Sequence, residues 1–572
     1  MKLHTLTVAL VAMSTLSVAC GDKSDDTADT GHGDHTDHDG GDETGGDETG
    51  GDETGGDETG GDETGGDETG GDETGGDETG GDETGGDETG GDDGPVTCEP
   101  TEPTVTELTG YYFDSHFIEG ESAVSNTGQI MRQNLITELK GYIGDLKDMA
   151  DSGGFAEGDI VSGLNYYFDF DGDTSAEDSF YYSPDLAIQE TWGEISTKNL
   201  KGKLAGNDSK TDHRPWSDST DEETGEVTIS EFYGWDADGV NSPESLVTHW
   251  FGEIEAQVLL YQEAVAGDSI LDHPPYLTED GVDRKQLIQK FLTGAVTFSQ
   301  GADDYLSNDV DGKGLLASTD CATEDDDVTC KKYSSIGHAW DEGFGYFGGA
   351  RNYGELDAAA IKANDNDANG DGCIDLITEY NWGGSVNAAK RDLGSADVVD
   401  ADDASLATNF VGDAWTGFEG GRAIIDVALV DGGPLTEDEM TELLTHRDLA
   451  ISSWEKAIAA TVVHYINDVR ADIDSCSAEG EDGFNFADFA KHWGEAKGFA
   501  LWFQFNPASP LLADADEDGV EDFQALHQLL GMSGPLWTSC DEASEAWYGE
   551  LETARTLLGA AYGFDDALLE AW

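Results

Sequence analysis

Two short segments each combine a histidine with carboxylates about one helical turn away. The first reads GHAWDEGFGYFGGARNY from Gly337, so His338 is followed by Asp341 and Glu342. On a helix, residues three and four positions apart project from one face. Imidazole and carboxylate groups together suit iron, zinc or manganese. The spacing therefore makes these three side chains candidate ligands of a metal half-site.

The second segment reads KHWGEAKGFALWFQFNP from Lys491 and places His492 and Glu495 in the same relation. Two half-sites on facing helices can complete one metal site, provided that the helices converge. The alternative is structural: each histidine bonds a nearby acid and holds two helices together. Spacing alone favours that alternative. Three further residues on one long helix are interpreted as ordinary helix residues: His446, Glu455 and His464.

Two acidic loops have the spacing of calcium ligands, with oxygen-bearing side chains on alternate residues and a glycine at the sixth position. The first, DANGDGCID, offers Asp367, Asn369, Asp371 and Asp375. The second, DADEDGVED, offers Asp514, Asp516, Asp518 and Asp522. Neither has the glutamate expected at position 12. They predict incomplete, dockerin-like Ca²⁺ loops that act as structural staples, and an acidic solvent loop is the alternative.

Other catalytic patterns are absent from the sequence. There is no nucleophile elbow, P-loop, HExxH motif or dinucleotide-binding fingerprint, and no convincing catalytic triad. The sequence therefore predicts a protein that is not an enzyme. A zinc peptidase that uses one of the His/Glu pairs is the third alternative, and the missing HExxH argues against it.

The elements that carry these residues have helical periodicity, and alternating strand patterns are scarce. In the segment 128–149 the apolar residues fall on one stripe. The same pattern recurs at 245–265, 284–306, around His338, and at 405–420, 436–473, 486–505 and 544–564. The expected fold is all-α, with long Asp/Gly-rich loops on a helical bundle. The likeness of the two histidine segments suggests two related bundles.

The charge balance is strongly acidic. The chain has 123 acidic and 27 basic residues, a net charge of −96. Residues 1–97 hold 29 of the acidic and two of the basic residues, so the remainder still carries 94 acidic against 25 basic residues. This balance excludes nucleic acid as a partner and favours cations or basic partners. Thirteen tryptophans, all beyond residue 190, predict a substantial core.

The N-terminus predicts export and lipidation. Residues 1–20 have a positive start, a short apolar stretch and Ala19 before Cys20, which is typical of a bacterial lipoprotein signal peptide. Cys20 would then be acylated and anchor the chain in a lipid bilayer, at the outer membrane or cell surface. A plain signal peptide cut near Ala19 is the alternative.

The segment 21–97 predicts a tether. It contains ten consecutive GDETG copies between Gly41 and Gly90, and this five-residue repeat has no apolar residue with which to build a core. Glycine and repelling acids favour a disordered, extended spacer. Residues 98–572 form the predicted folded domain. Its six cysteines suggest disulfides in an exported protein. Cys321 and Cys330 are the favoured pair, and the other pairings stay open.

Four spaced motifs give the domain a family resemblance: GESAVSNTGQIMRQNLITELKGYI, GHAWDEGFGYFG, ATVVHYINDV and KHWGEAKGFALWFQFNP. Together they resemble an imelysin-like bacterial lipoprotein family, the domain of unknown function 4856, from about Gly110 to the C-terminus. The resemblance implies two related helical bundles, export to the cell surface and a part in iron or haem acquisition.

The imelysin metal motif reads Gly-x-His-x-x-Glu, and this chain departs from it. Gly337 is adjacent to His338 and Asp341 replaces the glutamate, while Ala490 takes the glycine position before His492. The resemblance therefore implies a metal-binding role only for His338 with Asp341 or Glu342, and for His492 with Glu495. The resulting first hypothesis is a surface lipoprotein that binds iron, haem or another divalent metal such as zinc, with an outer-membrane uptake receptor as its partner. A calcium-stabilised structural or adhesive module is the second.

Overall fold

The computed structural model describes most of the chain beyond the repeats. The described residues are 98, 101, 110–182, 184, 186–207, 214–220, 224–225, 227–266, 273–323, 329–398, 406–479, 484–515, 519–540 and 545–572. Residues 91–572 form one compact unit. The predicted signal peptide, Cys20 and the GDETG repeats lie outside the described residues.

The described part of the chain is all-α, as the periodicity predicts. Its longer helices are α1 (Thr127–Ser152), α5 (Pro243–Ala266), α6 (Arg284–Leu292), α7 (Ser335–Phe347), α9 (Gly383–Val398), α10 (Phe410–Asp431), α11 (Glu437–Glu479), α12 (Phe486–Ala500) and α14 (Glu545–Tyr562). Shorter α-helices are α2 (Asp159–Phe168), α3 (Gly172–Ser175), α4 (Trp192–Ile195), α8 (Ala358–Ala363), α13 (Asp522–Leu530) and α15 (Asp566–Ala571).

Short 3₁₀ turns and one small hairpin complete the described elements. The turns are η1 (Lys201–Lys203), η3 (Gly314–Leu316), η4 (Tyr353–Glu355), η7 (Leu501–Phe505) and η8 (Pro510–Leu512). Strands β1 (Ser219–Thr220) and β2 (Val227–Thr228) pair antiparallel, with Ser219 opposite Thr228. No helix in the described residues is long and apolar enough to cross a membrane.

Local sequence explains where most helices begin and which face they bury. The predicted stripe of α1 is buried along its length: Ile130, Leu135, Ile136, Leu139, Ile143 and Leu146. Helix α5 begins at Pro243, whose fixed φ and missing N–H suit the first turn. Helix α10 begins at Phe410 and runs to Asp431, later than the predicted 405–420. Helix α9 was not predicted, because its sequence is rich in Gly, Ser and Ala and carries few large apolar residues.

The predicted helix at 284–306 is present but changes its winding. Helix α6 continues without a break into a π-helix, η2 (Thr293–Tyr305), in which Leu306 N–H donates to Gly301 O, five residues back. Gly294 and Gly301 lie against the rings of Trp502 and Trp454, where a Cβ atom would collide. Bare backbone at these two positions lets the indoles pack directly on the helix.

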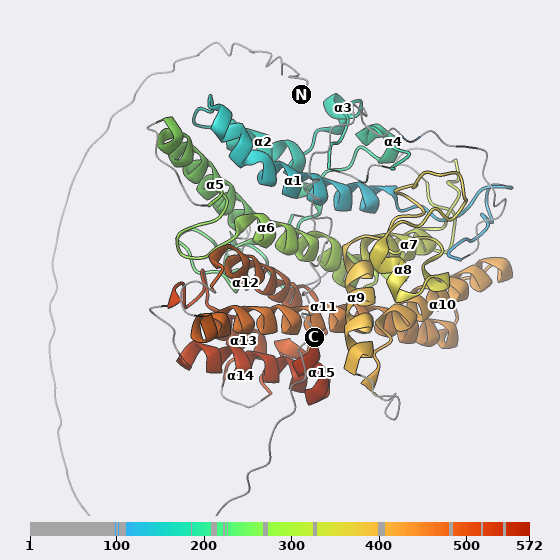
Figure 1. The fold of residues 1–572 in the computed structure, drawn as a ribbon. Helices are drawn as coiled ribbons and strands as arrows, with labels where there is room; N and C mark the ends of the chain where they lie inside the picture. Colours follow the sequence, from blue (N-terminus) through green and yellow to red (C-terminus); the bar gives the residue numbers. More distant parts are fainter. Residues whose placement is uncertain are drawn as a thin grey trace, which may run out of the picture. The chain divides into compact units, whose positions relative to one another are not determined.

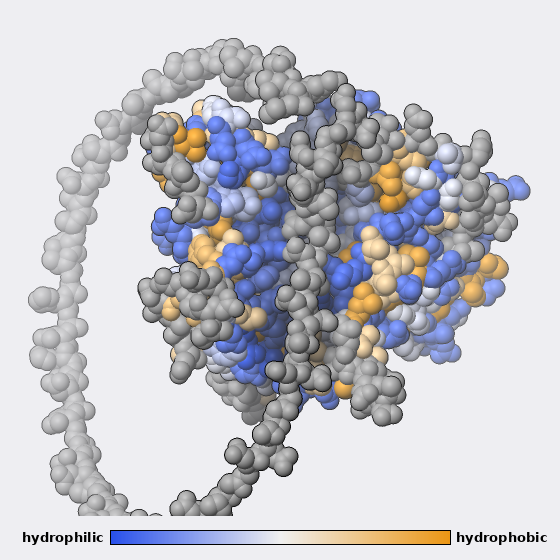
Figure 2. Space-filling model, viewed as in Figure 1, coloured by the Kyte–Doolittle hydropathy of each residue, from blue (hydrophilic) through white to orange (hydrophobic). Residues whose placement is uncertain are grey.

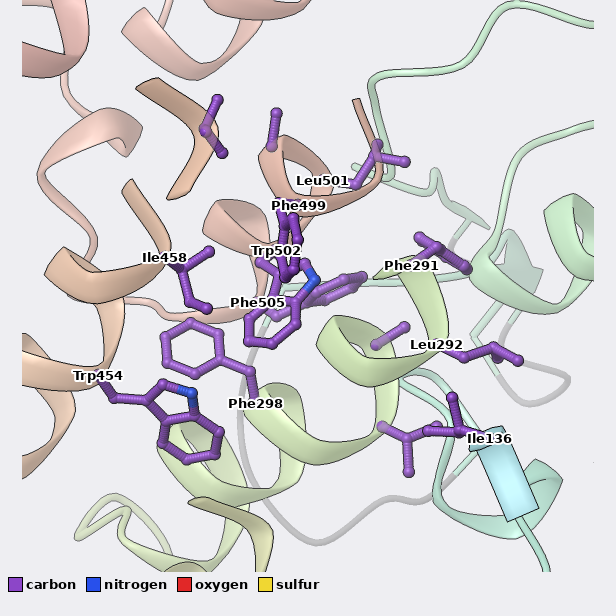
Figure 3. Close-up of a cluster of buried hydrophobic side chains, with 14 of the residues drawn as sticks. Ile136, Phe291, Leu292, Phe298, Trp454, Ile458, Phe499, Leu501, Trp502 and Phe505 are labelled. Atoms are coloured by element: carbon purple, nitrogen blue, oxygen red, sulfur yellow. The ribbon is translucent and has the colours of Figure 1, made fainter. Parts of the chain in front are cut away.

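The core is aromatic where η2, α11 and η7 meet (Figure 3). The ring of Phe298 lies 5.0 Å from that of Trp454 and 5.8 Å from that of Trp502, centroid to centroid. Helix α11 runs through the middle of the unit with α10 and α12 alongside (Figure 1). On the face shown in Figure 2 the coloured surface is mainly hydrophilic, with scattered apolar residues.

Candidate functional site

Asp341 of α7 lies at the centre of a buried polar network. Its side chain is fully buried, and Oδ1 accepts from Arg422 Nε of α10 and from Tyr111 Oη, both at 2.9 Å. Burial raises the pKa of Asp341, and the positive charges of Arg422 and Arg351 oppose that rise. This carboxylate is therefore engaged in an ion pair between two helices.

His338 and Glu342 lie on the same helix but at its partly exposed edge. The Nε2 atom of His338 is 3.7 Å from Glu342 Oε2, and its ring stacks on Tyr333 with centroids 4.0 Å apart. Its Nδ1 atom is buried without a hydrogen-bond partner. Glu342 Oε1 accepts from Gln129 Nε2 of α1 at 2.8 Å. The three predicted ligands of this segment thus divide between two environments.

On α12, His492 pairs with a carboxylate of another helix. Its Nδ1 is 2.8 Å from Asp472 Oδ2 of α11, and its ring lies parallel to Tyr465. Burial alone would lower the pKa of His492, but the hydrogen bond and charge of Asp472 prevail and raise it above the usual value. His492 therefore joins α12 to α11 through this bond to Asp472, which favours its protonated form.

This pair predicts a pH-dependent contribution to stability. Because the folded-state pKa of His492 is raised, its contribution is complete below the unfolded-state value of 6.5 and is lost as pH rises through the folded-state pKa. We expect the difference in unfolding free energy between wild type and His492→Gln to shrink as the pH increases from about 6.5. Urea unfolding across that range measures it. A difference that stays constant with pH would contradict the assignment.

Glu495 is the other predicted ligand on α12, and it lies within the protein. It is 4% exposed, and its Oε1 is 3.1 Å from Lys290 Nζ of α6. Its Oε2 atom is buried without a hydrogen-bond partner. Glu495 and His492 therefore bond to different helices.

The two histidine segments do not converge on a shared cation site. Helix α7 packs mainly on η2, α10 and α1, whereas α12 packs mainly on α6 and α11. Among the described residues, no group of three His, Cys, Asp or Glu side chains is arranged to hold a metal ion. The geometry fits the structural alternative, in which each histidine and each acid joins its own neighbours.

The first predicted calcium loop is closed around its own carboxylates. Asp367 Oδ2 accepts from Gly372 N at 2.8 Å, and Oδ1 accepts from Gly370 and Asp371 N–H groups. Gly372 has φ +88°, the left-handed conformation that the sixth position of such a loop requires. Asn369 Oδ1 accepts from Asp371 N at 2.8 Å. Amide groups of the loop thus occupy the oxygens that a cation would use.

Glu379 completes this loop, one residue beyond the expected position 12. It is 1% exposed, and its two oxygens accept from Asn369 N and Asp375 N at 3.1 and 2.8 Å. Burial raises the pKa of Glu379, and the charges of Asp375 and Asp367 add to that rise, while the two backbone hydrogen bonds oppose it. The sequence shows a glutamate next to the expected position, since Glu379 follows Thr378. Spacing alone could not predict that the Glu379 side chain points into the loop. The oxygen donors fit Ca²⁺, provided that the carboxylates turn from the amide groups to the ion.

The second predicted calcium loop has an equivalent hydrogen bond between its first carboxylate and its sixth residue. Asp514 Oδ2 accepts from Gly519 N at 2.9 Å, the same five-residue step that joins Asp367 to Gly372. Gly519 also has a positive φ, +92°. Asp522 begins α13. The predicted ligands Asp516 and Asp518 lie outside the described residues.

Residues 255–365 match the family model DUF4856, a domain of unknown function. The DUF4856 segment runs from the second half of α5 past α8, so it contains η2 and α7 with His338, Asp341 and Glu342. The predicted resemblance is confirmed over this segment, which is shorter than the predicted span from Gly110. Comparisons with curated proteins and with solved structures give no match.

The DUF4856 description names no activity, and the likeness to imelysins stays a prediction. The segment also contains Cys321–Cys330, one of the three disulfides among the described residues and the pair that the spacing favours. The other two link Cys98 to Cys373 and Cys476 to Cys540. Their sequence separations of 275 and 64 residues explain why spacing could not assign them.

The remaining histidines and one acid of α11 have structural partners. His446 Nδ1 lies 3.1 Å from Thr416 O of α10, and His464 Nε2 lies 3.4 Å from Asp468. Glu455 is fully buried and accepts from Ser509, Asn506 and Tyr562. Burial raises its pKa, and these three neutral donors oppose the rise. Glu455 thereby holds the loop after α12 and the end of α14 on α11.

Proposed function

We propose that this chain is a non-catalytic surface module: a calcium-stabilised helical domain displayed on an acidic tether. The observation that carries this proposal is the loop at 367–379. Its first carboxylate, Asp367, accepts from the N–H of the positive-φ Gly372, and its last, the buried Glu379, accepts from Asn369 N. Alternating oxygen donors around such a turn are the ligand set of Ca²⁺. The separate environments of His338 and His492 support a structural module over a transition-metal binder.

Three disulfides support the exported location in this proposal. Such bonds persist in oxidising compartments outside the cytosol. We propose that Cys20 is acylated and anchors the chain in the outer membrane or cell surface, and that residues 21–97 act as a spacer. The acidic domain would repel nucleic acid and anionic lipid, so its partners are cations or basic surfaces.

Calcium should stabilise the folded domain. At a free Ca²⁺ concentration of 100 times Kd, binding would add about 2.7 kcal/mol to the free energy of unfolding. The melting temperature should rise with Ca²⁺ and fall with a chelator, and Zn²⁺ or Fe²⁺ should not substitute because hard oxygen donors favour Ca²⁺. Calorimetry of the full chain measures this effect.

Two variants assign the calcium effect to a loop. Asp367→Asn should remove the stabilisation that belongs to the first loop, and Asp514→Asn provides the matched change in the second, because both carboxylates bond the glycine five residues on. A melting temperature that is insensitive to Ca²⁺ in the wild type would overturn the proposal.

A second candidate function is iron, haem or zinc binding in metal acquisition. One observation favours it: His338 has a buried Nδ1 atom without a hydrogen-bond partner and an Nε2 atom near Glu342. Metal analysis of the purified protein should then show a stoichiometric transition metal that is lost in His338→Ala. The same metal content in both proteins would exclude His338 as a ligand.

A further inference from the structure

The Cys98–Cys373 disulfide joins the N-terminal segment to the middle of the loop at 367–379. Cys98 is the first residue after the predicted tether. A few residues further on, Thr101 donates to Asp371 O from its backbone N at 3.0 Å and from its Oγ1 at 2.8 Å. The chain is therefore attached to one loop, covalently and by hydrogen bonds, before the continuous described fold starts at Gly110.

That loop is firmly connected to the body of the domain. Ile374 N donates to Leu186 O at 2.8 Å, and Ile188 N donates to Ile374 O at 2.9 Å. Gln189 adds two bonds, from its Nε2 to Asp375 Oδ1 at 2.7 Å and from Leu376 N to its Oε1 at 3.0 Å. Cys373 itself is buried. Load applied at Cys373 is thus shared by several bonds at once.

The next part of the chain is held differently. Residues 110–126, here called the strap, cross α7 and α10 and are fixed by successive non-covalent contacts. Tyr111 N donates to Arg351 O at 2.7 Å, and its ring stacks on Phe344 at 4.0 Å. Phe113 lies under the Arg422 guanidinium, 4.6 Å from its carbon. Tension that entered from the N-terminal end would load these contacts one after another, and each hydrogen bond is worth only about 1 kcal/mol.

We propose that the Cys98–Cys373 disulfide is a load-bearing junction, which carries tension from the tether into the loop at 367–379 and keeps it off the strap. This junction proposal rests on the proposed function only in assuming that the N-terminal segment is the tether. The junction protects the buried network of α7, because Tyr111 donates to Asp341 and the strap would otherwise be peeled from that contact first.

Single-molecule force spectroscopy tests the junction on the full chain, held at its two ends without reductant. Beyond the gradual stretching of the tether, the wild type should show no unfolding step before the main unfolding event. Cys98→Ser/Cys373→Ser should show a first extension at lower force, of roughly 10 nm, the contour length from residue 98 to residue 126. The control Cys321→Ser/Cys330→Ser, which removes a disulfide away from the junction, should behave as the wild type.

An early extension in the wild type, or none in the junction variant, would overturn the proposal. If the junction variant does not fold, reductant added to the folded control variant under low force should produce the early extension instead. Repeating the measurement with Ca²⁺ and with chelator separates the two proposals. If Ca²⁺ does not stabilise the domain, the proposed calcium function is wrong. The early extension tests the junction alone.

Discussion

Asp341→Asn is expected to lower the free energy of unfolding by about 3–5 kcal/mol. The substitution keeps the side-chain shape but removes the charge that Arg422 faces at 2.9 Å. Arg422 is 1% exposed, so its guanidinium would remain buried with only the more distant Asp426 carboxylate, 3.9 Å from Nη1, as a counter-charge. Urea unfolding at neutral pH measures the loss.

Glu342→Gln is the matched control, one residue further along α7. Glu342 is partly exposed, and its contacts with Gln129 and His338 should be worth about 1 kcal/mol or less. If Asp341→Asn also cost less than about 1 kcal/mol, the Asp341 carboxyl would already be neutral in the folded protein. The ion-pair assignment would then be wrong.

Removing the Cys98–Cys373 disulfide is expected to have the second large effect. The crosslink closes a loop of 275 residues, and the chain-entropy model gives about 5–6 kcal/mol for its loss in Cys98→Ser/Cys373→Ser. The stabilisation comes from the unfolded chain, which the bond makes more compact. Urea unfolding should therefore also show a larger denaturant dependence in the variant.

Cys321→Ser/Cys330→Ser is the comparison for this effect, since its cysteines are only 9 residues apart. The same model gives about 2–3 kcal/mol for that loss. Equal losses in the two variants, or the reverse order, would show that contacts of the folded state outweigh loop closure.

The helices could be predicted because their signals are local. The stripe of α1 has a period that only an amphipathic helix satisfies, and every member of it is buried. The winding of η2 could not be predicted in this way, because it accompanies the packing of Trp502 and Trp454, which are distant in sequence. Helix α9 was missed because small residues give no clear periodicity.

In the candidate site, too, local features could be predicted and tertiary contacts could not. That His338 and Glu342 share an edge of α7 follows from their spacing, and so does the turn that brings Gly372 to Asp367. The pairing of Asp341 with Arg422, 81 residues away, and of His492 with Asp472 on another helix depends on tertiary packing. One sequence therefore predicts which groups are available, while the fold decides which of them meet.

The π-helix η2 has a consequence for comparing this chain with its relatives. Its hydrogen bonds span five residues, so each residue turns through a smaller angle than in an α-helix. A helical wheel drawn at the usual pitch therefore drifts out of phase beyond Thr293. Loss or gain of a residue within this stretch would rotate everything that follows, and a larger side chain at Gly294 or Gly301 would collide with an indole, so η2 should tolerate neither changes in length nor substitutions at these two glycines.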